Sequence, residues 1–239
     1  MHRIFLDRET LNDEHPRATG DEYHYLTRVL RVRQGTSLRA VCGDGFEYDV
    51  LVGPVNRREA VLQIIDRREV NRELPFEVHI YLGYLKAGSF QEVLGDLVEC
   101  GATSVTPVIF SRCQASLPAL TSPRRDRFRR IIQYHTGLSG RTRLMDVFPP
   151  AELSEALKQC RHFDHKVLFW EDHPGKSYNT PKPSPKDRVA LFIGPEGGID
   201  PDEVNMAREV GFVIASLGAR TLRARLAPVV AIASFCRQS

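Results

Sequence analysis

The chain has 239 residues, of which 42% are hydrophobic and 26% are charged, and its formal net charge at pH 7 is +3. This length and composition suffice for one large or two small domains with hydrophobic cores, and they exclude a chain that is disordered by default. No stretch approaches the roughly 20 consecutive apolar residues of a membrane span, and the N-terminus is too weakly apolar for a signal peptide. We therefore expect a cytoplasmic protein.

Arginine accounts for 27 of the 33 basic residues. Arginine favours bidentate binding of phosphate or carboxylate. A GC-rich genome gives the same bias without a functional cause, so composition alone leaves both explanations open. Position is more informative, because residues 112–143 hold eight arginines and one acid, a net charge of +7, while the rest of the chain sums to −4. Such a local charge favours an anionic partner.

The cysteine and histidine patterns give no support for a metal site. The five cysteines are scattered and form no CxxC pair. We expect free thiols, most of them buried. The histidines also lack the spacing of metal ligands, so no metal is expected.

The first 70 residues predict a small, β-rich domain. Short runs of strand-like composition are separated by glycine-containing turn signals. One helix is expected over residues 23–31, with Asp21 as its N-cap and Leu26, Val29 and Leu30 on its apolar face. The domain thus resembles a small barrel with an edge helix, built from strands at 36–42, 46–52 and 59–65.

A charged stretch at 66–75 predicts a linker, and residues 76–239 then alternate between strand and helix patterns. Such alternation indicates an α/β domain with a largely parallel sheet. The proline-rich segment 172–187 is expected to be a surface loop, either a plain insertion or a lid. Strands are expected at 78–82, 104–109, 166–170, 189–193 and 213–215, and helices at 89–100, 123–137, 151–160, 200–210 and from about 221 onward.

A glycine-rich loop, Gly-Pro-Glu-Gly-Gly at 194–198, lies between an expected strand and a helix that begins with a capping box of Asp200 and Glu203. Open α/β sheets bind ligands at this position, and glycines let a ligand approach the backbone. A plain turn remains the alternative, because one glycine-rich loop is a weak signal. A second loop at 217–223 follows the next strand, and two such loops make a pocket. Neither loop fits the motifs for ATP or NAD.

Several motifs together resemble one family. They are Ile-Gly-Pro-Glu-Gly-Gly at 193–198, Leu-Gly-Ala-Arg-Thr-Leu-Arg at 217–223, and the residues that match the pattern "ELG…P…SRC" between positions 99 and 113. The stretches 1–5 and 24–35 look like the RNA-binding part of the same family. The chain thus resembles, over nearly its whole length, the RsmE-type 16S ribosomal RNA (uridine-N3) methyltransferases of the SPOUT superfamily.

The resemblance implies an N-terminal PUA-like β-barrel domain at 1–70 and a C-terminal SPOUT domain at 76–239, an α/β trefoil knot whose loops wrap S-adenosylmethionine. It also implies a homodimer that acts on 16S ribosomal RNA of the small subunit. The cofactor-binding residues it implies are Trp170, Glu171, Gly194, Glu196, Gly197, Gly198, Leu217, Gly218 and Leu222. The RNA-binding residues expected are Arg3, Arg28, Arg31, Arg124 and Arg125.

Methyl transfer to uridine needs help at N3, which carries a proton and is a poor nucleophile until the proton leaves. A base, or a cation that stabilises the uridine anion, is therefore required. Arg112, Arg141 and Arg223 are the candidate catalytic residues, since arginine stays charged and donates in a fixed fork. An ordinary phosphate contact or a surface ion pair is the alternative for each.

The chain also departs from the family pattern near the expected active site. Residues 137–141 read Gly-Leu-Ser-Gly-Arg where the family usually has "EQSGR". Arg225 and Leu226 stand in place of the acid and the hydroxyl of "LRxETA", and Asp96 stands where a lysine is common. Two alternatives follow: a divergent paralogue that methylates another nucleotide, or a non-catalytic RNA-binding or cofactor-sensing homologue. The matching cofactor loops favour an enzyme.

Overall fold

The structure is a computed structural model that describes residues 2–85, 87–113, 121–172 and 183–236. The chain divides into two compact units. The first contains residues 1–73 and 132–144, and the second contains residues 74–131 and 145–239. The division after Glu73 falls within the expected linker. The return of residues 132–144 to the first unit has no signal in the sequence.

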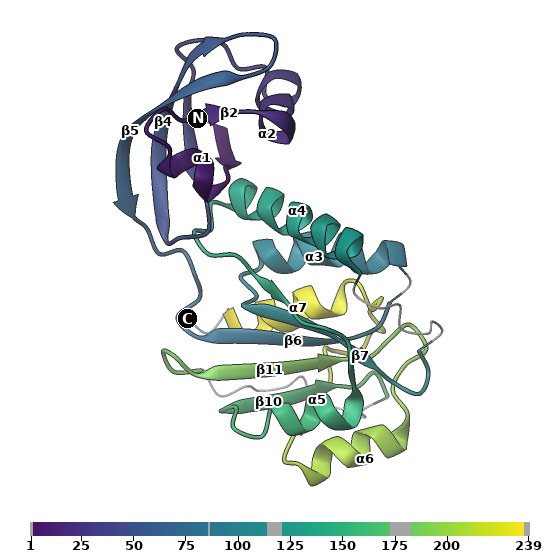
Figure 1. Ribbon diagram of the computed structural model, residues 1–239. Coiled ribbons are helices and arrows are strands. Elements are labelled where there is room, and N and C mark those ends of the chain that lie inside the picture. Colours follow the sequence, from purple (N-terminus) through teal and green to yellow (C-terminus); the bar gives the residue numbers. More distant parts are fainter. Residues whose placement is uncertain (1, 86, 114–120, 173–182, 237–239) are drawn as a thin grey trace. The chain divides into compact units, whose positions relative to one another are not determined.

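The first unit is built on a curled five-stranded sheet in the order β1-β3-β4-β5-β2 (Figure 1). The antiparallel hairpins β3–β4 and β4–β5 confirm the three predicted strands. β5 extends to Glu69, so it takes up part of the predicted linker, and β4 continues through Gly53 by a bulge instead of ending there. The strands are β1 (His2–Phe5), β2 (Arg17–Ala18), β3 (Ser37–Val41), β4 (Phe46–Val55) and β5 (Ala60–Glu69).

The predicted helix at 23–31 is only partly correct. A short helix α2 (Gly20–His24) passes into a π-helical turn (Tyr25–Val29), and another short helix, α1 (Arg8–Asn12), lies earlier in the chain. Asp21 is not the N-cap, because Thr19 occupies that position. Val29 is 63% exposed, although Leu26 is fully buried. The wider π turn changes the residue spacing, so the prediction is wrong for Val29, whereas Leu30 packs half-buried against the core of the first unit as expected.

A buried carboxylate organises one part of the first sheet. Glu47, on β4, is 1% exposed and forms ion pairs with Arg68 at 2.7 Å, Arg72 at 2.9 Å and Arg39 at 3.1 Å. Burial alone would raise the pKa of Glu47, but the hydrogen bond from Arg68 and the charges of Arg72 and Arg39 hold this pKa below its usual value. These three arginines are therefore engaged within the first unit.

The second unit contains a parallel sheet in the order β12-β10-β11-β6-β7-β8, with β9 also paired to β7. Helices cover both faces: α5 packs with α6, and α3 packs with α7 (Figure 1). This confirms the predicted α/β class. The strands are β6 (Glu77–Gly83), β7 (Ser104–Ile109), β8 (Asp146–Val147), β9 (Ala151–Glu152), β10 (His165–Phe169), β11 (Arg188–Ile193) and β12 (Val213–Ala215), and the helices are α3 (Ala87–Glu99), α5 (Leu153–Gln159), α6 (Pro201–Glu209) and α7 (Ala227–Cys236). Helix α4 (Ser122–Ser139) begins in this unit, and its residues from 132 onward belong to the first unit.

Two expectations in this unit have different outcomes. The capping box at the start of α6 is confirmed, since Asp200 accepts a hydrogen bond from the amide of Asp202 and Glu203 accepts one from the amide of Asp200. The last helix begins at Ala227, not near residue 221, so the preceding segment is free to line a pocket. Most of the expected loop at 172–187 lies outside the described residues. Among the helices described here, none is long and apolar enough to cross a membrane.

The buried cluster around Glu47 predicts unequal effects of two similar substitutions. Glu47→Gln leaves three guanidinium groups without their shared buried carboxylate, and we expect it to lower the free energy of unfolding by about 1–3 kcal/mol. Glu59→Gln is the control, because Glu59 pairs with Arg17, whose side chain is 52% exposed. Its expected effect is below about 1 kcal/mol. Urea unfolding followed by circular dichroism measures both, and equal losses would contradict the prediction.

Candidate active site

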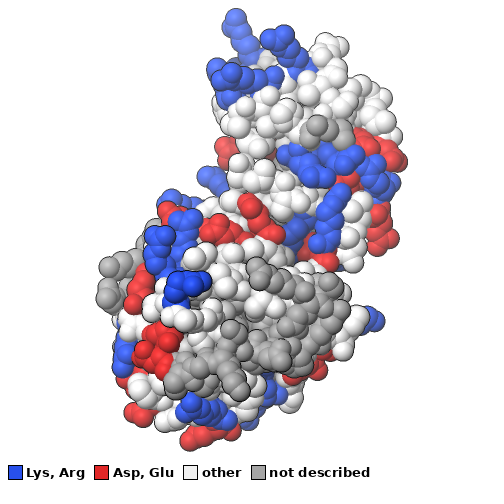
Figure 2. Space-filling view, turned by 180° about the vertical axis from the view of Figure 1, so that it is seen from behind, with Lys and Arg blue, Asp and Glu red and all other residues white. Residues whose placement is uncertain are grey.

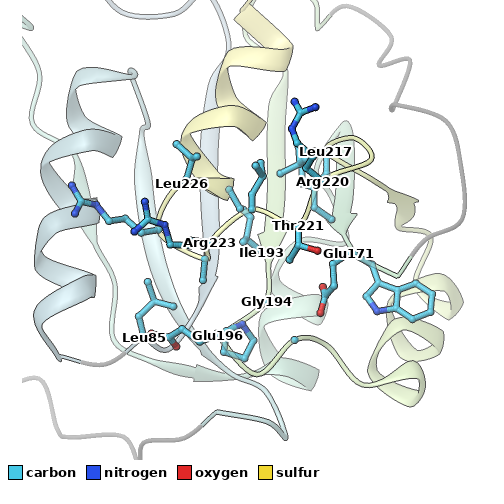
Figure 3. A pocket seen from close by; sticks show the side chains of 18 of the residues that line it. Leu85, Glu171, Ile193, Gly194, Glu196, Leu217, Arg220, Thr221, Arg223 and Leu226 are labelled. Atoms are coloured by element: carbon cyan, nitrogen blue, oxygen red, sulfur yellow. The ribbon is translucent and has the colours of Figure 1, made fainter.

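A cavity of about 770 Å³ lies within the second unit, at the carboxyl edge of its parallel sheet. Four parts of the chain line it: residues 169–171 at the end of β10, residues 193–196 and 198 after β11, residues 216–227 between β12 and α7, and residues 85, 89, 92 and 96 after β6 and on α3. Parallel strands end at the same edge of a sheet, which brings these segments together. In Figure 3, Glu171 and Thr221 lie on one side of Gly194, and Arg223 and Leu226 lie on the other.

The glycines at 194–198 are required mainly because loops pack against one another. A Cβ atom on Gly194 would lie 2.5 Å from Cγ1 of Ile199, and one on Gly197 would lie 2.6 Å from the carbonyl oxygen of Arg112. Gly198 has a φ of +78°, and a Cβ there would overlap the carboxylate of Glu171. From the sequence, these three glycines were expected to let a ligand approach the backbone. The packing shows a further effect, which is to let this loop contact its neighbours.

Gly218 fits the original explanation better. It lines the cavity with a φ of +117°, and a Cβ atom added to it would meet nothing within 4 Å. Its amide donates a hydrogen bond to the hydroxyl of Ser216 at 3.2 Å. That hydroxyl in turn donates to the carbonyl oxygen of Gly218 at 3.0 Å. The backbone of this second loop is thus held in a turn whose glycine faces open space.

Trp170 is the one tryptophan of the sequence, and it lines the cavity at the end of β10. Its ring packs against the hydrophobic core below the sheet. Its Nε1 atom is buried and has no hydrogen-bond partner among the residues that the structure describes. A buried donor without a partner is costly, and no described residue offsets that cost here.

Arg112 lies beside the glycine-rich loop and outside the residues that line the cavity. Its guanidinium donates to Asp200 at 2.9 Å, and the neighbouring amide of Ser111 donates to Glu203 at 2.6 Å. The amide of Asp202 and the charge of Arg112 keep the pKa of Asp200 below its usual value. The turn after β7 is therefore fastened to the start of α6.

The other two candidate catalytic arginines lie in different units. Arg223 lines the cavity and is exposed. Arg141 belongs to the first unit, where its side chain is 6% exposed and its Nε atom donates to Glu73 at 2.9 Å. The structure thus brings Arg223 to the cavity and Arg112 to the adjacent loop. It assigns Arg141 a buried ion pair.

Arg225 does not leave an unbalanced charge in the cavity wall. Its NH1 atom lies 2.5 Å from the carboxylate of Glu92, and its Nε atom lies 3.5 Å from the carboxylate of Asp96. All three residues line the cavity. Arg225 and Asp96, two separate departures from the family pattern in the sequence, thus pair with each other in the structure.

A packing constraint accounts for a third departure, at Gly137. This glycine is buried inside α4, and a Cβ atom on it would overlap the backbone amide of Phe5 and come within 2.7 Å of the carbonyl carbon of Ile4. The close approach of α4 to β1 within the first unit leaves no room for a side chain. A carboxylate at this position is incompatible with the observed packing.

Of the expected cofactor residues, all but Gly197 line the cavity. Sequence reasoning missed the wall made by the end of β6 and the start of α3. The order of predicted elements could have indicated this wall, because the strand at 78–82 is followed by a helix and its carboxyl end lies at the same edge of the sheet as the glycine-rich loop. The lining residues that were missed are Leu85, Ser89 and Glu92.

Comparison with known proteins identifies the family. Residues 72–235 match the RNA methyltransferase domain, and residues 18–65 match the RNA methyltransferase PUA domain. The chain belongs to the RNA methyltransferase family. Its two units therefore combine a PUA-like curled sheet with a parallel α/β domain, which confirms the predicted fold class.

Relatives of this methyltransferase cover most of its length. Ribosomal RNA small subunit methyltransferase E of Bacillus subtilis is 27% identical over 92% of this chain and 89% of its own. The enzyme of the same name from Synechocystis is 26% identical over 98% of this chain and 77% of its own.

Solved structures extend the comparison. Ribosomal RNA small subunit methyltransferase E from Neisseria gonorrhoeae, bound to S-adenosyl methionine, has a TM-score of 0.85 at 25% identity and covers 100% of this chain and 98% of its own. A putative methyltransferase from Legionella pneumophila, in complex with the same cofactor, also has a TM-score of 0.85, at 26% identity over 99% of this chain and 97% of its own.

Proposed function

We propose that this RNA methyltransferase transfers a methyl group from S-adenosylmethionine to N3 of a uridine in the 16S ribosomal RNA of the small subunit, in the cytoplasm. The observation that carries the proposal is the cavity at the carboxyl edge of the sheet, lined by the three loops that resemble the family's cofactor loops. The ribosomal RNA enzymes among the relatives support the substrate.

The cavity fits S-adenosylmethionine in size and chemistry. Its volume of about 770 Å³ lies within the roughly 300–1,000 Å³ typical of small-molecule sites. The carboxylate of Glu171 offers an acceptor for hydroxyl groups, Trp170 lines the cavity beside it, and Gly218 exposes backbone. We propose that these groups hold the cofactor together with Gly194, Glu196, Gly198, Leu217 and Leu222, whereas Gly197 acts through loop packing. The cofactor, when bound, supplies an electrophilic methyl group.

The arginines then divide by role. Arg223, exposed in the cavity, is placed to stabilise negative charge that develops on the uridine base as its N3 proton leaves. Arg112 is a positioning residue, because it fastens the turn beneath Gly197 to the start of α6. Arg141 stabilises the first unit through its buried pair with Glu73. Only the first of these touches the proposed reactants.

The proposal includes a homodimer and a knotted arrangement of the cofactor loops, both implied by the family resemblance. Leu226, at the edge of the cavity, is 45% exposed although it begins an apolar segment that continues into α7. Single exposed leucines are common on monomeric proteins as well, so the homodimer rests on the family resemblance.

Gly198→Ala tests the cofactor site against a matched control. Both Gly198, at φ +78°, and Gly211, at φ +83°, disfavour an L-residue, so alanine strains either backbone similarly. Only at Gly198 does the new methyl group overlap Glu171 at the cavity. We expect Gly198→Ala to weaken S-adenosylmethionine binding at least about tenfold and Gly211→Ala to leave it within about twofold. Calorimetry and the fluorescence of Trp170 report binding, and no binding by the unmodified protein at saturating cofactor would refute the site.

Nucleoside analysis of ribosomal RNA tests the reaction itself. A strain that lacks the gene is expected to lose one N3-methyluridine from its 16S RNA. We expect the unmodified gene to restore this methylated nucleoside and the Gly198→Ala gene not to restore it. Mass spectrometry of digested RNA measures the product. Loss of a different methylated nucleoside would identify a divergent target. No loss, with cofactor binding intact, would favour a non-catalytic homologue.

RNA binding is expected to depend strongly on salt, because arginines contact phosphates and release counterions. On the face shown in Figure 2, basic side chains gather at the end of the first unit where β4 and β5 are joined. Arg3, Arg28 and Arg31 are exposed in this unit, and Arg124 and Arg125 lie at the start of α4.

The test is fluorescence anisotropy with a 16S RNA fragment at several salt concentrations. Arg28→Ala together with Arg31→Ala is expected to lower the affinity and to reduce the slope of log K against log salt by about 0.9 for each lost phosphate contact. The control is Arg17→Ala, whose guanidinium already pairs with Glu59. An affinity that does not change with salt would contradict the electrostatic mechanism.

A further inference from the structure

One wall of the cavity is a polar stripe on α3. Ser89, Glu92 and Asp96 line the cavity at successive turns of this helix, because residues three and four apart share a face. Leu94 and Leu97, on other faces of the same helix, are fully buried. The helix thus presents two carboxylates, one turn apart, to the cavity and to the segment before α7.

Arg225 joins that segment to the stripe. The segment from Leu217 to Leu226 lines the cavity and has little regular structure, with a turn at its end in which the amide of Leu226 donates to the carbonyl oxygen of Arg223. Within this turn, the guanidinium of Arg225 bonds to Glu92 at 2.5 Å and to Asp96 at 3.5 Å. One cation thus bridges two carboxylates that lie 129 and 133 positions before it in the sequence.

We propose that Arg225 is a positioning residue. Its bridge to Glu92 and Asp96 holds residues 217–226 against α3, so that Gly218 and Arg223 face the cavity. The bridge requires one cation shared by two carboxylates among positions 92, 96 and 225, and a cation at either position 96 or position 225 satisfies it. This inference rests on the proposed function, since it assigns how the third cofactor loop is held in place.

The exposure of the bridge sets the size of the effect. The side chains of Arg225, Glu92 and Asp96 are 51%, 59% and 40% exposed, so solvent screens each pair and the loss of one pair has a small effect. Reversal at position 225 is more severe, because it places three carboxylates together. We expect Arg225→Glu to weaken S-adenosylmethionine binding about tenfold, with the KM for the cofactor affected more than kcat.

The decisive variant is the double reversal Asp96→Lys with Arg225→Glu. It keeps two negative charges and one positive charge at the same three positions, and we expect it to restore cofactor affinity to within about threefold of the unmodified protein. Arg208→Glu, on the exposed side of α6, makes the same change of charge outside the cavity and is expected to have no effect. Arg225→Lys, which keeps the charge, is expected to stay close to the unmodified protein.

Limited trypsin digestion gives a readout that does not depend on the cofactor. Arg220 and Arg223 are exposed cleavage sites within the segment. We expect faster cleavage there in Arg225→Glu and a return to slow cleavage in the double reversal. Thermal unfolding shows whether Arg225→Glu folds. If it does not fold, Asp96→Asn is used in its place, and we expect a smaller increase in the rate of cleavage.

The outcomes separate the two proposals. If the unmodified protein fails to bind cofactor or to methylate RNA while the cleavage pattern follows the charge pairing, the proposed function fails and the role of Arg225 stands. Unchanged cleavage and cofactor affinity in Arg225→Glu would overturn the role of Arg225. A loss of RNA affinity that the double reversal does not restore, with cofactor affinity unchanged throughout, would overturn it in favour of a direct phosphate contact.

Discussion

The close packing of backbone at the carboxyl edge of the parallel sheet is the constraint on which the second unit depends. The loop at 194–198 lies so near the ends of other strands that Cβ atoms on Gly83, Gly197 or Gly198 would collide with Pro195, Arg112 or Glu171, respectively. Because no side chain fits between these segments, the loop is held by its neighbours on several sides. The cavity takes its shape from these contacts, and a rigid site of this kind suits a reaction in which the protein chiefly positions two reactants.

Ion pairs divide the arginines of the chain into two populations. One population is engaged by carboxylates: Glu47 binds three arginines, Glu73 binds Arg141, and Asp200 binds Arg112. The other is exposed and makes no ion pair with the described residues, as at Arg28 and Arg31. Buried and half-buried pairs fix the fold, whereas exposed guanidinium groups are the ones available to phosphates. The number of arginines that an RNA can contact is therefore smaller than the arginine content of the sequence indicates.

The sequence predicted what depends on local pattern. Continuous apolar runs such as 189–193 place the buried strands within one or two residues, and the capping box at Asp200 marks the start of α6. Features that depend on distant contacts were not predicted. These features are the π-helical turn at Tyr25–Val29, which alters the side of its segment that faces solvent, and the membership of residues 132–144 in the first unit. The ion pair between Arg225 and Glu92 on α3 is a third. Local spacing holds no information about contacts of this kind.

The pairing of Arg225 with Asp96 changes the meaning of the departures from the family pattern. Independent drift after a loss of activity would leave unmatched charges, because nothing would then hold the wall of the cavity in place. Here Arg225 and Asp96, whose charges are opposite in sign to those of the family pattern, contact each other. Glu92 forms a second ion pair with the guanidinium of Arg225. Gly137, the missing carboxylate, is explained by the approach of α4 to β1. The departures are thus consistent with a cavity whose geometry is still under constraint, and that constraint favours an active methyltransferase over a non-catalytic relative.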